Sequence, residues 1–437
     1  MSEKSMGSQK KKAVNNQRPA HGAKRRALFD KTLVLMLLIM VTGYFFIHDL
    51  YGGTLLEHNA WDSYTLQAYG WQSGRLSVDA GHANYLELAV YNGEYFVSFP
   101  PFPSVVMFPL TLIFGMDTPN NLVVMVYALI IAAAAYKIFR LCKMKDTHAA
   151  LLALGFIWGS STFWMSTIGG VWFQAQLLAL ALGLLTVYCA LTNRRVLAYL
   201  FTAFAVGCRP FYILLFPIIF VFFYMNDRED GEGGFFKTAL KQWKCLIAPV
   251  LIGCAYLWYN YIRFDNPLEF GHNYLPEFTE SEKGQFSLSY IWPNLLQQFD
   301  PVELKFDGGK LRMEYSIFNG FMFFVANPLF ILLFVSAAKN IIKRRTNAVS
   351  ATLMAGMLLE LLLLCMHKTM GGWQFGARYI CDLLPMLAMY LACSRLKEEA
   401  LQPSGTPQTL KHYEIYIIVF GILLNAYGCM AMNFYHG

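Results

Sequence analysis

Charged residues are scarce in this sequence. They make up 14% of the 437 residues, whereas hydrophobic residues make up 56%. Soluble domains usually carry about 25% charged residues, so the composition excludes an ordinary soluble domain and favours a chain embedded in a bilayer. The formal net charge of +7 does not indicate nucleic-acid binding, because the cations collect beside apolar runs.

Metal-binding and disulfide patterns are also missing. The chain has nine cysteines, but it has no CxxC pair and no cluster of Cys with His. We therefore expect neither a zinc site nor a disulfide framework, and no metal or other cofactor. No internal repeat is evident, which argues against the inverted-repeat design of many transporters.

Apolar runs of membrane-spanning length, roughly 20 residues, recur along the whole chain. The sequence predicts an all-α polytopic membrane protein, a bundle of about 11–13 transmembrane helices with short helices in its outer loops. Pro103–Gly115 is short and contains Pro103 and Pro109, so we expect it either to dip into the membrane without crossing or to lie partly buried beside the bundle. The predicted helices are Thr32–His48, Pro103–Gly115, Asn121–Leu141, Ala149–Ser166, Trp172–Leu191, Val196–Val206, Phe211–Met225, Cys245–Ile262, Phe318–Ala338, Ser350–Met366, Tyr379–Ser394 and Tyr413–Phe434.

Basic clusters give the expected orientation in a plasma (inner) membrane. They lie within residues 1–31, at 137–145, at 194–195 and at 343–345, and the positive-inside rule places all of them in the cytoplasm. Residues 1–31 are then a cytoplasmic basic tail, and residues 32–437 form a single transmembrane domain. Three segments, at about residues 50–102, 264–316 and 367–378, fall on the extracytoplasmic face.

The first outer segment is the first part of the chain that is dense in carboxylates. Asp62 opens a short amphipathic pattern at the membrane surface, where it could accept a proton from an attacking hydroxyl; a capping or solvated aspartate is the alternative. Asp79 is a second catalytic candidate that equally suits a turn. Glu87 and Glu94 lie on either side of an Asn-Gly pair typical of a β-hairpin turn, so we interpret both as structural.

Cations and aromatic residues elsewhere are candidates for ligand binding, because rings stack on sugars and a guanidinium suits a phosphate. Arg209 interrupts an apolar stretch and should face a cavity, an anion or the interface, since burying it alone costs at least about 2.5–3.5 kcal/mol. Glu360, within a late apolar run, is expected to pair with a cation. An interfacial aromatic belt with snorkelling cations is the alternative interpretation. The phosphate candidates are Arg209, His272, Lys368 and Arg378, and the candidates that line the substrate site are Tyr64, Tyr259, Asn260, Tyr274, Trp373 and Tyr379.

The three outer segments contain several short motifs: Asp62-Ser63-Tyr64, Gly93-Glu94-Tyr95-Phe96, Phe99-Pro100-Pro101, Tyr259-Asn260-Tyr261, Phe270-Gly271-His272 and Phe375-Gly376-Ala377-Arg378-Tyr379. Through these motifs the outer segments resemble those of the GT-C fold glycosyltransferases, in particular the bacterial protein O-mannosyltransferase and aminoarabinose transferase group. In that family an acidic residue of the first outer loop is the base, and Asp62 matches it. Ser63 follows Asp62, so the paired acids of the family pattern are missing, which leaves open whether Asp62 acts alone or with Asp79.

The resemblance implies a glycosyltransferase that moves a hexosyl or pentosyl group from a polyprenyl-phosphate donor to an acceptor hydroxyl at the extracytoplasmic face. Asp62 would be the general base, and Arg378 would receive the departing phosphate with help from His272 or Lys368. The expected partners are the lipid-linked donor, a protein, lipid or glycan acceptor, and the bilayer, without nucleic acid. The alternatives are a transporter or flippase of a lipid-linked sugar, and a polymerase or ligase of surface polysaccharide.

Overall fold

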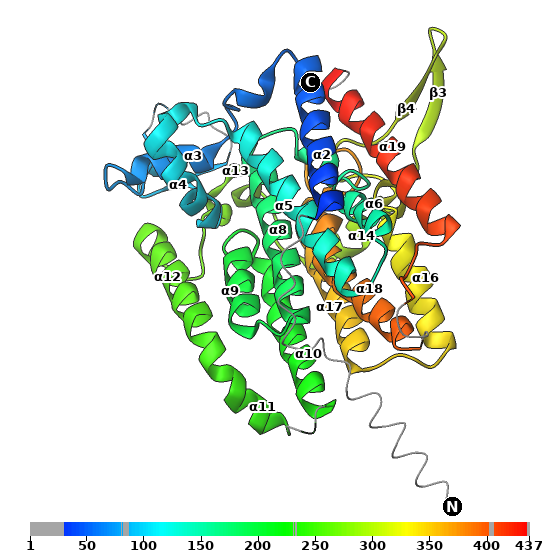
Figure 1. The fold of residues 1–437 in the computed structure, drawn as a ribbon. Helices are drawn as coiled ribbons and strands as arrows, with labels where there is room; N and C mark the ends of the chain where they lie inside the picture. Colours follow the sequence, from blue (N-terminus) through cyan, green and yellow to red (C-terminus); the bar gives the residue numbers. More distant parts are fainter. Residues whose placement is uncertain are drawn as a thin grey trace, which may run out of the picture.

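The computed structural model describes residues 30–79, 81, 87–229, 231, 234–401 and 406–434. The predicted basic tail therefore lies outside the described residues, except for Asp30 and Lys31. Within the described part, helices dominate and strands form two small hairpins. The chain thus has the predicted helical architecture (Figure 1).

Eight helical segments of the described chain are long and apolar enough to cross a membrane, and four further apolar helices are shorter. Each segment matches one of the dozen predicted helices. The spans are Lys31–Leu50 (α2), Asn120–Leu141 (α5), Val171–Leu191 (α8), Pro210–Glu229 (containing α10, Leu215–Glu229), Phe235–Phe264 (α11, Phe235–Gln242, and α12, Ile247–Phe264), Ala348–Cys365 (α17), Arg378–Glu399 (η8, Arg378–Leu383, and α18, Leu384–Glu399) and His412–Phe434 (α19). The shorter apolar helices are α4 (Phe102–Phe114), α6 (Asp146–Ile157), α9 (Arg195–Val206) and α16 (Leu329–Ile342).

Two predicted helices are interrupted. The run Ala149–Ser166 divides into α6 and α7 (Thr162–Met165), with Gly159 between them. The run Phe318–Ala338 begins with loop and contains α15 (Phe323–Ala326) before α16, with Pro328 at the break. Glycine and proline both end helices, and apolarity alone concealed these breaks. The remaining short helices are α3 (Ser63–Trp71), α13 (Pro276–Thr279) and α14 (Ile291–Gln297).

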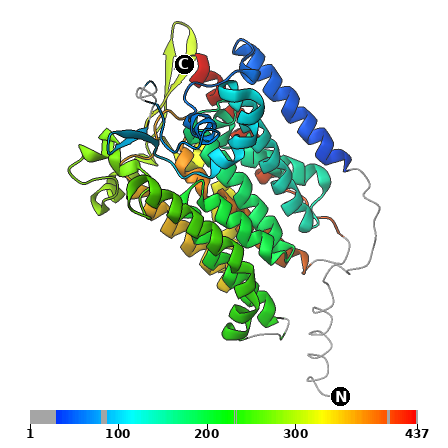
Figure 2. The same ribbon diagram turned by 90° about the vertical axis from the view of Figure 1, so that its left-hand side faces the viewer.

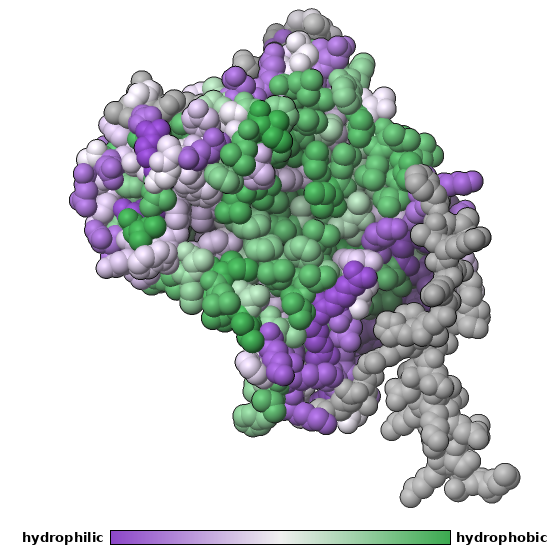
Figure 3. Space-filling view, turned by 60° about the vertical axis from the view of Figure 1, so that its left-hand side comes forward, coloured by the Kyte–Doolittle hydropathy of each residue, from purple (hydrophilic) through white to green (hydrophobic). Residues whose placement is uncertain are grey.

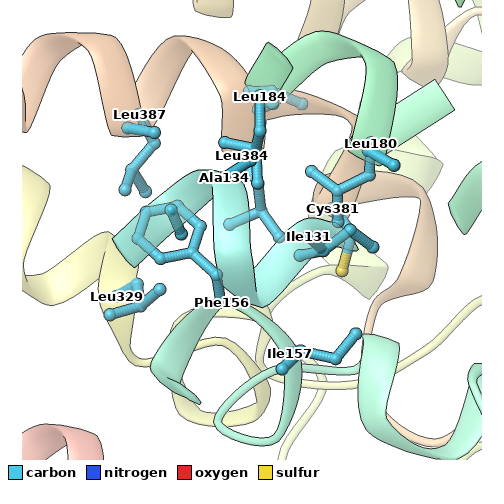
Figure 4. Close-up of a cluster of buried hydrophobic side chains, with 14 of the residues drawn as sticks. Ile131, Ala134, Phe156, Ile157, Leu180, Leu184, Leu329, Cys381, Leu384 and Leu387 are labelled. Carbon is cyan, nitrogen blue, oxygen red and sulfur yellow. The ribbon is translucent and has the colours of Figure 1, made fainter. Parts of the chain in front are cut away.

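Helix α8 lies at the centre of the bundle. Its sequence is apolar on every side, which is typical of a helix surrounded by other helices, and nearly all of it is buried. Figure 4 shows Leu180 and Leu184 of α8 in one buried cluster with side chains of α5, α6, α16 and α18. By contrast, α12 is exposed along most of its length at the edge of the bundle (Figure 1).

A broad apolar surface covers the side of the molecule. Figure 3 shows it as a continuous hydrophobic area between two polar ends. Exposed leucine, phenylalanine and tryptophan side chains of α2 and α12 contribute to it. A surface of this kind matches the hydrocarbon layer of a bilayer, so the structure supports a protein that spans the membrane.

Both strand pairs are antiparallel hairpins. β1 (Leu88–Tyr91) pairs along its length with β2 (Glu94–Val97), and Tyr91 opposite Glu94 is the last pair before the turn. Both turn residues, Asn92 and Gly93, have positive φ. This confirms the predicted Asn-Gly turn. The second hairpin, β3 (Glu303–Asp307) with β4 (Lys310–Glu314), was not predicted; it projects from the end of the molecule opposite α11 (Figure 2).

The basic clusters meet at one end of the bundle, which we call the basic end. Lys137 forms an ion pair with Asp30 at the start of α2, Lys143 pairs with Glu399, and Lys397 donates to the Arg345 carbonyl. The three predicted outer segments meet at the other end, which we call the loop end. There His272 contacts the Ser98 carbonyl, and Phe286 forms a β-bridge with His367.

Helix α4 stays at the loop end. Ser104 near its start donates to Gln67 of α3 at 2.6 Å, and Thr111 near its end accepts from Gln72 at 2.9 Å. Because both ends of α4 contact the α3 region, α4 lies beside α3 (Figure 1). This agrees with the expectation that the segment does not cross.

Candidate active site

Asp62 caps the start of α3 and is fully buried. Its Oδ1 accepts hydrogen bonds from the backbone N–H groups of Tyr64 and Thr65 at 3.0 and 3.2 Å. Its Oδ2 accepts from the Thr65 hydroxyl and, at 2.8 Å, from Asn120 Nδ2 at the start of α5. The predicted short helix is therefore present, but it is buried on most sides and is not amphipathic.

Two effects on the pKa of Asp62 oppose each other. Burial disfavours the carboxylate and raises the pKa, while the hydrogen bonds from Thr65 and Asn120 favour the carboxylate. The net effect is a raised pKa. A carboxylate with a raised pKa binds a proton more readily, which is what a general base requires.

Four other charged residues at the loop end form what we call the buried charge cluster: Arg378 and Asp382, which are buried, and Glu87 and Arg209, which are half-buried. Within it, Arg209 donates from Nε and Nη2 to Oδ2 of Asp382, at 2.9 and 2.5 Å. The other oxygen of Asp382 accepts from Gln176 Nε2 of α8 at 2.8 Å. Arg209 thus has the anionic partner that its burial requires.

Arg378 is in the opposite situation. It is 4% exposed, and its Nε and Nη1 are buried without a hydrogen-bond partner in the described part of the chain. The guanidinium lies 5.6 Å from the ring centre of Phe173 and 4.8 Å from that of Tyr379. Gly371 packs against it so closely that a Cβ there would lie 2.8 Å from Nε. A desolvated guanidinium with free donors is suited to an anion.

Glu87 lies directly before the first hairpin and interacts electrostatically with Arg378. Its Oε1 accepts from Trp172 Nε1 at 2.5 Å, and its backbone, with φ of 68°, is held by two hydrogen bonds from Ser98 to its carbonyl. Burial raises the pKa of Glu87 to about 7, although Trp172 and Arg378 both favour the ionised form. Glu87 therefore titrates near neutral pH.

The first turns of α8 connect Asp62 with the cluster. The Val171 N–H donates to the Trp61 carbonyl at 2.9 Å, next to Asp62. The following residues contact the cluster: Trp172 bonds Glu87, Phe173 lies against Arg378, and Gln176 bonds Asp382 and the Arg378 carbonyl. Asp62 and Arg378 therefore lie at the same end of the bundle, on either side of one helix start.

Two aromatic candidates complete this arrangement. Tyr64 is fully buried, its hydroxyl has no partner among the described residues, and it interacts electrostatically with Asp62, Glu87 and Arg209. Tyr379 lies between the two cations, with its ring centre 4.9 Å from the Arg209 guanidinium and 4.8 Å from that of Arg378. Both residues are among the predicted substrate-lining set.

His272 is held by a backbone contact. Its Nδ1 contacts the Ser98 carbonyl, which can only accept, so Nδ1 carries the proton. Burial lowers the pKa of His272 to about 3, so the ring is neutral and Nε2 is an acceptor. This contact joins the second outer segment to the first, and the role of His272 as a phosphate ligand stays a prediction.

Several predicted residues lie outside the cluster. Asp79 is exposed and forms an ion pair with Arg75, and the Lys368 ammonium donates to the Glu277 carbonyl at 2.6 Å. Trp373 is exposed beside Phe318. The three remaining candidates lie in or beside the end of α12. The Tyr259 ring lies under the Arg263 guanidinium, and Asn260 accepts a hydrogen bond from Arg263 and donates one to the Pro267 carbonyl. Tyr274, in the loop that follows, stacks on Phe264.

Sequence reasoning missed Asp382 and undervalued Glu87. Asp382 is a lone acid in an apolar run, the same signal that drew attention to Arg209, and it is the partner that Arg209 needed. Glu360, which was expected to form an ion pair, has no hydrogen-bond partner for either carboxyl oxygen within the described residues. The Asn-Gly turn led us to interpret Glu87 as a structural residue. Its electrostatic interaction with Arg378 was not predicted.

No group of three or more His, Cys, Asp or Glu side chains in the described ranges could hold a metal ion. The cluster acids are instead separated by guanidinium and amide groups.

Solved structures share this fold. The Archaeoglobus fulgidus oligosaccharyltransferase in the apo form matches with a TM-score of 0.52 and 14% identity, over 93% of this chain and 56% of that chain. The AglB oligosaccharyltransferase of that organism, in complex with an inhibitory peptide and a dolichol-phosphate, matches with a TM-score of 0.50 and 13% identity, over 92% and 55%. ArnT from Cupriavidus metallidurans bound to undecaprenyl phosphate gives 0.49 and 13%, over 92% and 75%.

By sequence, no family model and no curated protein matches the chain. The fold nevertheless defines the class: this is a polytopic membrane protein with the GT-C fold, which confirms the architecture that the outer segments indicated. The chain spans little more than half the length of the archaeal oligosaccharyltransferases.

Proposed function

We propose that this protein is a glycosyltransferase that moves a sugar from a polyprenyl-phosphate donor to an acceptor hydroxyl at the extracytoplasmic membrane face. The loop end would carry the active site, and the basic end would face the cytoplasm by the positive-inside rule. The hexosyl or pentosyl identity of the sugar is left open, as is the acceptor.

The observation that carries this proposal is the unpaired guanidinium of Arg378. A buried cation without a partner is costly, and proteins keep such groups where a ligand supplies the counter-charge. The phosphate of a lipid-linked donor is an anion delivered at the membrane surface, where Arg378 lies. A protein of this fold binds a dolichol-phosphate, and we extend that class of ligand to this chain.

In the proposed reaction, the oxygen of the acceptor hydroxyl attacks the anomeric carbon, and its proton passes to Asp62. The bond from the anomeric carbon to the phosphate oxygen breaks, and the polyprenyl phosphate leaves with one more negative charge. Arg378 stabilises that charge as it develops, in a water-poor site where such stabilisation is large. The Thr65 hydroxyl donates a hydrogen bond to Asp62 Oδ2. In the proposed reaction the hydroxyl of the acceptor takes this place and donates to the same oxygen.

The cations have different roles in this scheme. Arg209 is neutralised by Asp382, so it would orient Asp382 and Tyr379 and would not be the primary phosphate ligand. Lys368 would meet a phosphate only after leaving the Glu277 carbonyl. We therefore assign the phosphate to Arg378 first.

Purified protein incubated with labelled polyprenyl-phosphate sugars and candidate acceptors tests the proposal. We expect Asp62→Asn to lower the transfer rate by at least about 100-fold, the usual contribution of a general base, while the protein stays folded and membrane-inserted. Asp117→Asn, which changes an exposed carboxylate near the same end, should keep the wild-type rate. Wild-type transfer by Asp62→Asn would remove the base assignment, and translocation without bond cleavage in liposomes would indicate a flippase.

A further inference from the structure

A cavity opens at the basic end of the bundle, away from the candidate active site. Its volume is about 630 Å³, within the range of about 300–1,000 Å³ that is typical of ligand sites. It lies where the start of α2, the end of α5 and the start of α6 meet. Its lining includes Thr32, Arg140, Lys143, Lys145, Asp146 and Thr147, which are three cations, one acid and two hydroxyl side chains.

The loop between α5 and α6 carries two of these cations on a fixed backbone. Met144 is fully buried, whereas Lys143 and Lys145 on either side of it are exposed. The Lys143 carbonyl accepts a hydrogen bond from the Gln408 N–H at 3.0 Å, and the Lys145 N–H donates to the Gln408 carbonyl at 2.8 Å. Lys143 has φ of 55°, a conformation that is uncommon for a residue with a side chain. The strand-like contact with Gln408 therefore fixes the backbone from which both lysine side chains extend.

The acids near this cavity neutralise two of its three cations. Arg140 pairs with Asp146 at 2.6 Å, and Lys143 pairs with Glu399 at 2.5 Å. The Lys145 ammonium has neither a hydrogen bond nor an ion pair within the described part of the chain. Unlike Arg378, Lys145 is exposed, so its charge costs the empty protein little.

Neutral donors stand beside this ammonium. The hydroxyl groups of Thr32 and Thr147 form no hydrogen bond with any described residue. Helix α6 begins at Asp146 without a capping side chain, so the N–H groups of its first turn also favour an anion. The cavity thus offers one ammonium, two hydroxyl groups and a helix start to a ligand with negatively charged oxygens.

Helix α2 connects the cavity with the apolar surface of the molecule. It lies on the outside of the bundle (Figure 2) and contacts α5 and α6. Thr32 lines the cavity, and Leu35 and Ile39 follow it on the same face of the helix. Their side chains are 59% and 49% exposed, so they face the hydrocarbon layer of a membrane. A ligand with a charged head and an apolar tail therefore fits this place better than a free anion does.

We propose that the cavity binds the headgroup of an anionic phospholipid from the leaflet at the basic end. The lipid phosphate accepts from Lys145, Thr32 and Thr147, and an acyl chain lies along Leu35 and Ile39. Basic pockets between transmembrane helices are suited to such headgroups. The site is separate from the buried charge cluster, and it does not depend on the proposed function.

Native mass spectrometry of the purified protein tests the proposal, because it counts bound lipids and gives the Kd of the tightest one. The probes are dioleoyl-phosphatidylglycerol, which is anionic, and dioleoyl-phosphatidylcholine, which has the same phosphate without net charge. Phosphatidylglycerol should bind at least about tenfold more tightly. Inorganic phosphate in excess should not displace it, since free phosphate has no tail to place on α2.

Lys145→Gln should weaken phosphatidylglycerol binding about fivefold, the usual contribution of one lysine near an anionic lipid, and should leave phosphatidylcholine binding unchanged. Lys145→Arg keeps the charge and should retain the wild-type Kd. Lys343→Gln, which removes another exposed cation of the basic end outside the cavity, provides the matched control and should also bind as the wild type does. Because the Lys145 side chain has no partner in the described structure, its variants should unfold at the wild-type temperature.

Three results would overturn the proposal. Equal Kd values for the two lipids would exclude recognition of the charge. An equal loss in Lys145→Gln and Lys343→Gln would assign the attraction to the basic end as a whole instead of the cavity. Displacement of the lipid by inorganic phosphate would make the cavity a site for a free anion.

Discussion

The two ends of the bundle use charged residues in opposite ways. At the basic end, Arg195 pairs with Asp227, Lys143 with Glu399 and Lys137 with Asp30. At the loop end, Arg209 pairs with Asp382. The buried guanidiniums of Arg263 and Arg378 form no ion pair within the described ranges: Arg263 donates to the Val97 carbonyl and to Asn260, and Nε and Nη1 of Arg378 have no hydrogen-bond partner there. The acid Glu87 bonds a tryptophan instead of a cation.

The difference separates charges that stabilise and orient a membrane protein from charges that are available to a ligand. The Lys143–Glu399 and Lys137–Asp30 pairs are partly exposed, so they cost little, and positive charges at this end fix the side of the membrane. An unpaired guanidinium in a desolvated position destabilises the empty protein and recovers that free energy when an anion binds. We therefore expect mutations at the loop end to have larger effects, on stability where a pair is broken and on activity where the cation is unpaired.

Breaking the Arg209–Asp382 pair should have the largest effect. Asp382→Asn leaves Arg209 buried without a counter-charge, which should destabilise the protein by about 3–5 kcal/mol, measured as thermal unfolding in detergent. The double variant Arg209→Gln with Asp382→Asn removes both charges and should regain part of the loss. Equal stability of the single and double variants would contradict the pairing argument.

Arg378→Ala should affect catalysis more than folding. Removing a preorganised donor to developing charge typically lowers the rate about 100- to 1,000-fold, and because Arg378 has no ion-pair partner, no acid is left unpaired by its loss. The turnover of labelled donor and the unfolding temperature are measured on the same preparation. Arg312→Ala, on the exposed β3–β4 hairpin, provides the cation control; a large loss of stability in Arg378→Ala would identify the side chain as structural.

Gly371→Ala should have an intermediate effect. The backbone there has φ of +90°, which costs a residue with a side chain about 1–2 kcal/mol, and the added Cβ would press on Arg378 Nε. We expect weaker donor binding together with a modest loss of stability. Gly284→Ala, at positive φ but with open space around it, isolates the backbone contribution, and identical binding in the two variants would exclude the contact with Arg378.

The smallest effect is expected at the basic end. Lys143→Gln removes a partly exposed ion pair with Glu399, so stability should change by about 0–1 kcal/mol and the transfer rate should not change. A change comparable to that of Asp382→Asn would remove the distinction between the two ends.

Local chemistry made part of this structure predictable. Twelve apolar runs became the eight spans and four shorter helices, and the Asn-Gly pair became the turn of the first hairpin. The breaks at Gly159 and Pro328 were missed because a run of apolar residues gives no measure of how far a helix continues. The sequence correctly predicted a short helix at Asp62, after the first apolar helix. It did not predict that Asp62 is buried and hydrogen-bonded by Asn120, which lies 58 positions later in the chain.

The sequence by itself determined a helical membrane protein with its basic clusters on one side and three polar segments on the other, because apolar length and charge position are properties of local sequence. Only the tertiary structure decided which charge has a partner. Arg209 reaches Asp382 across 173 residues, while Arg378 meets two aromatic rings and a glycine. The free energy of a buried charge depends on the neighbours that folding brings to it, and those neighbours come from distant parts of the chain.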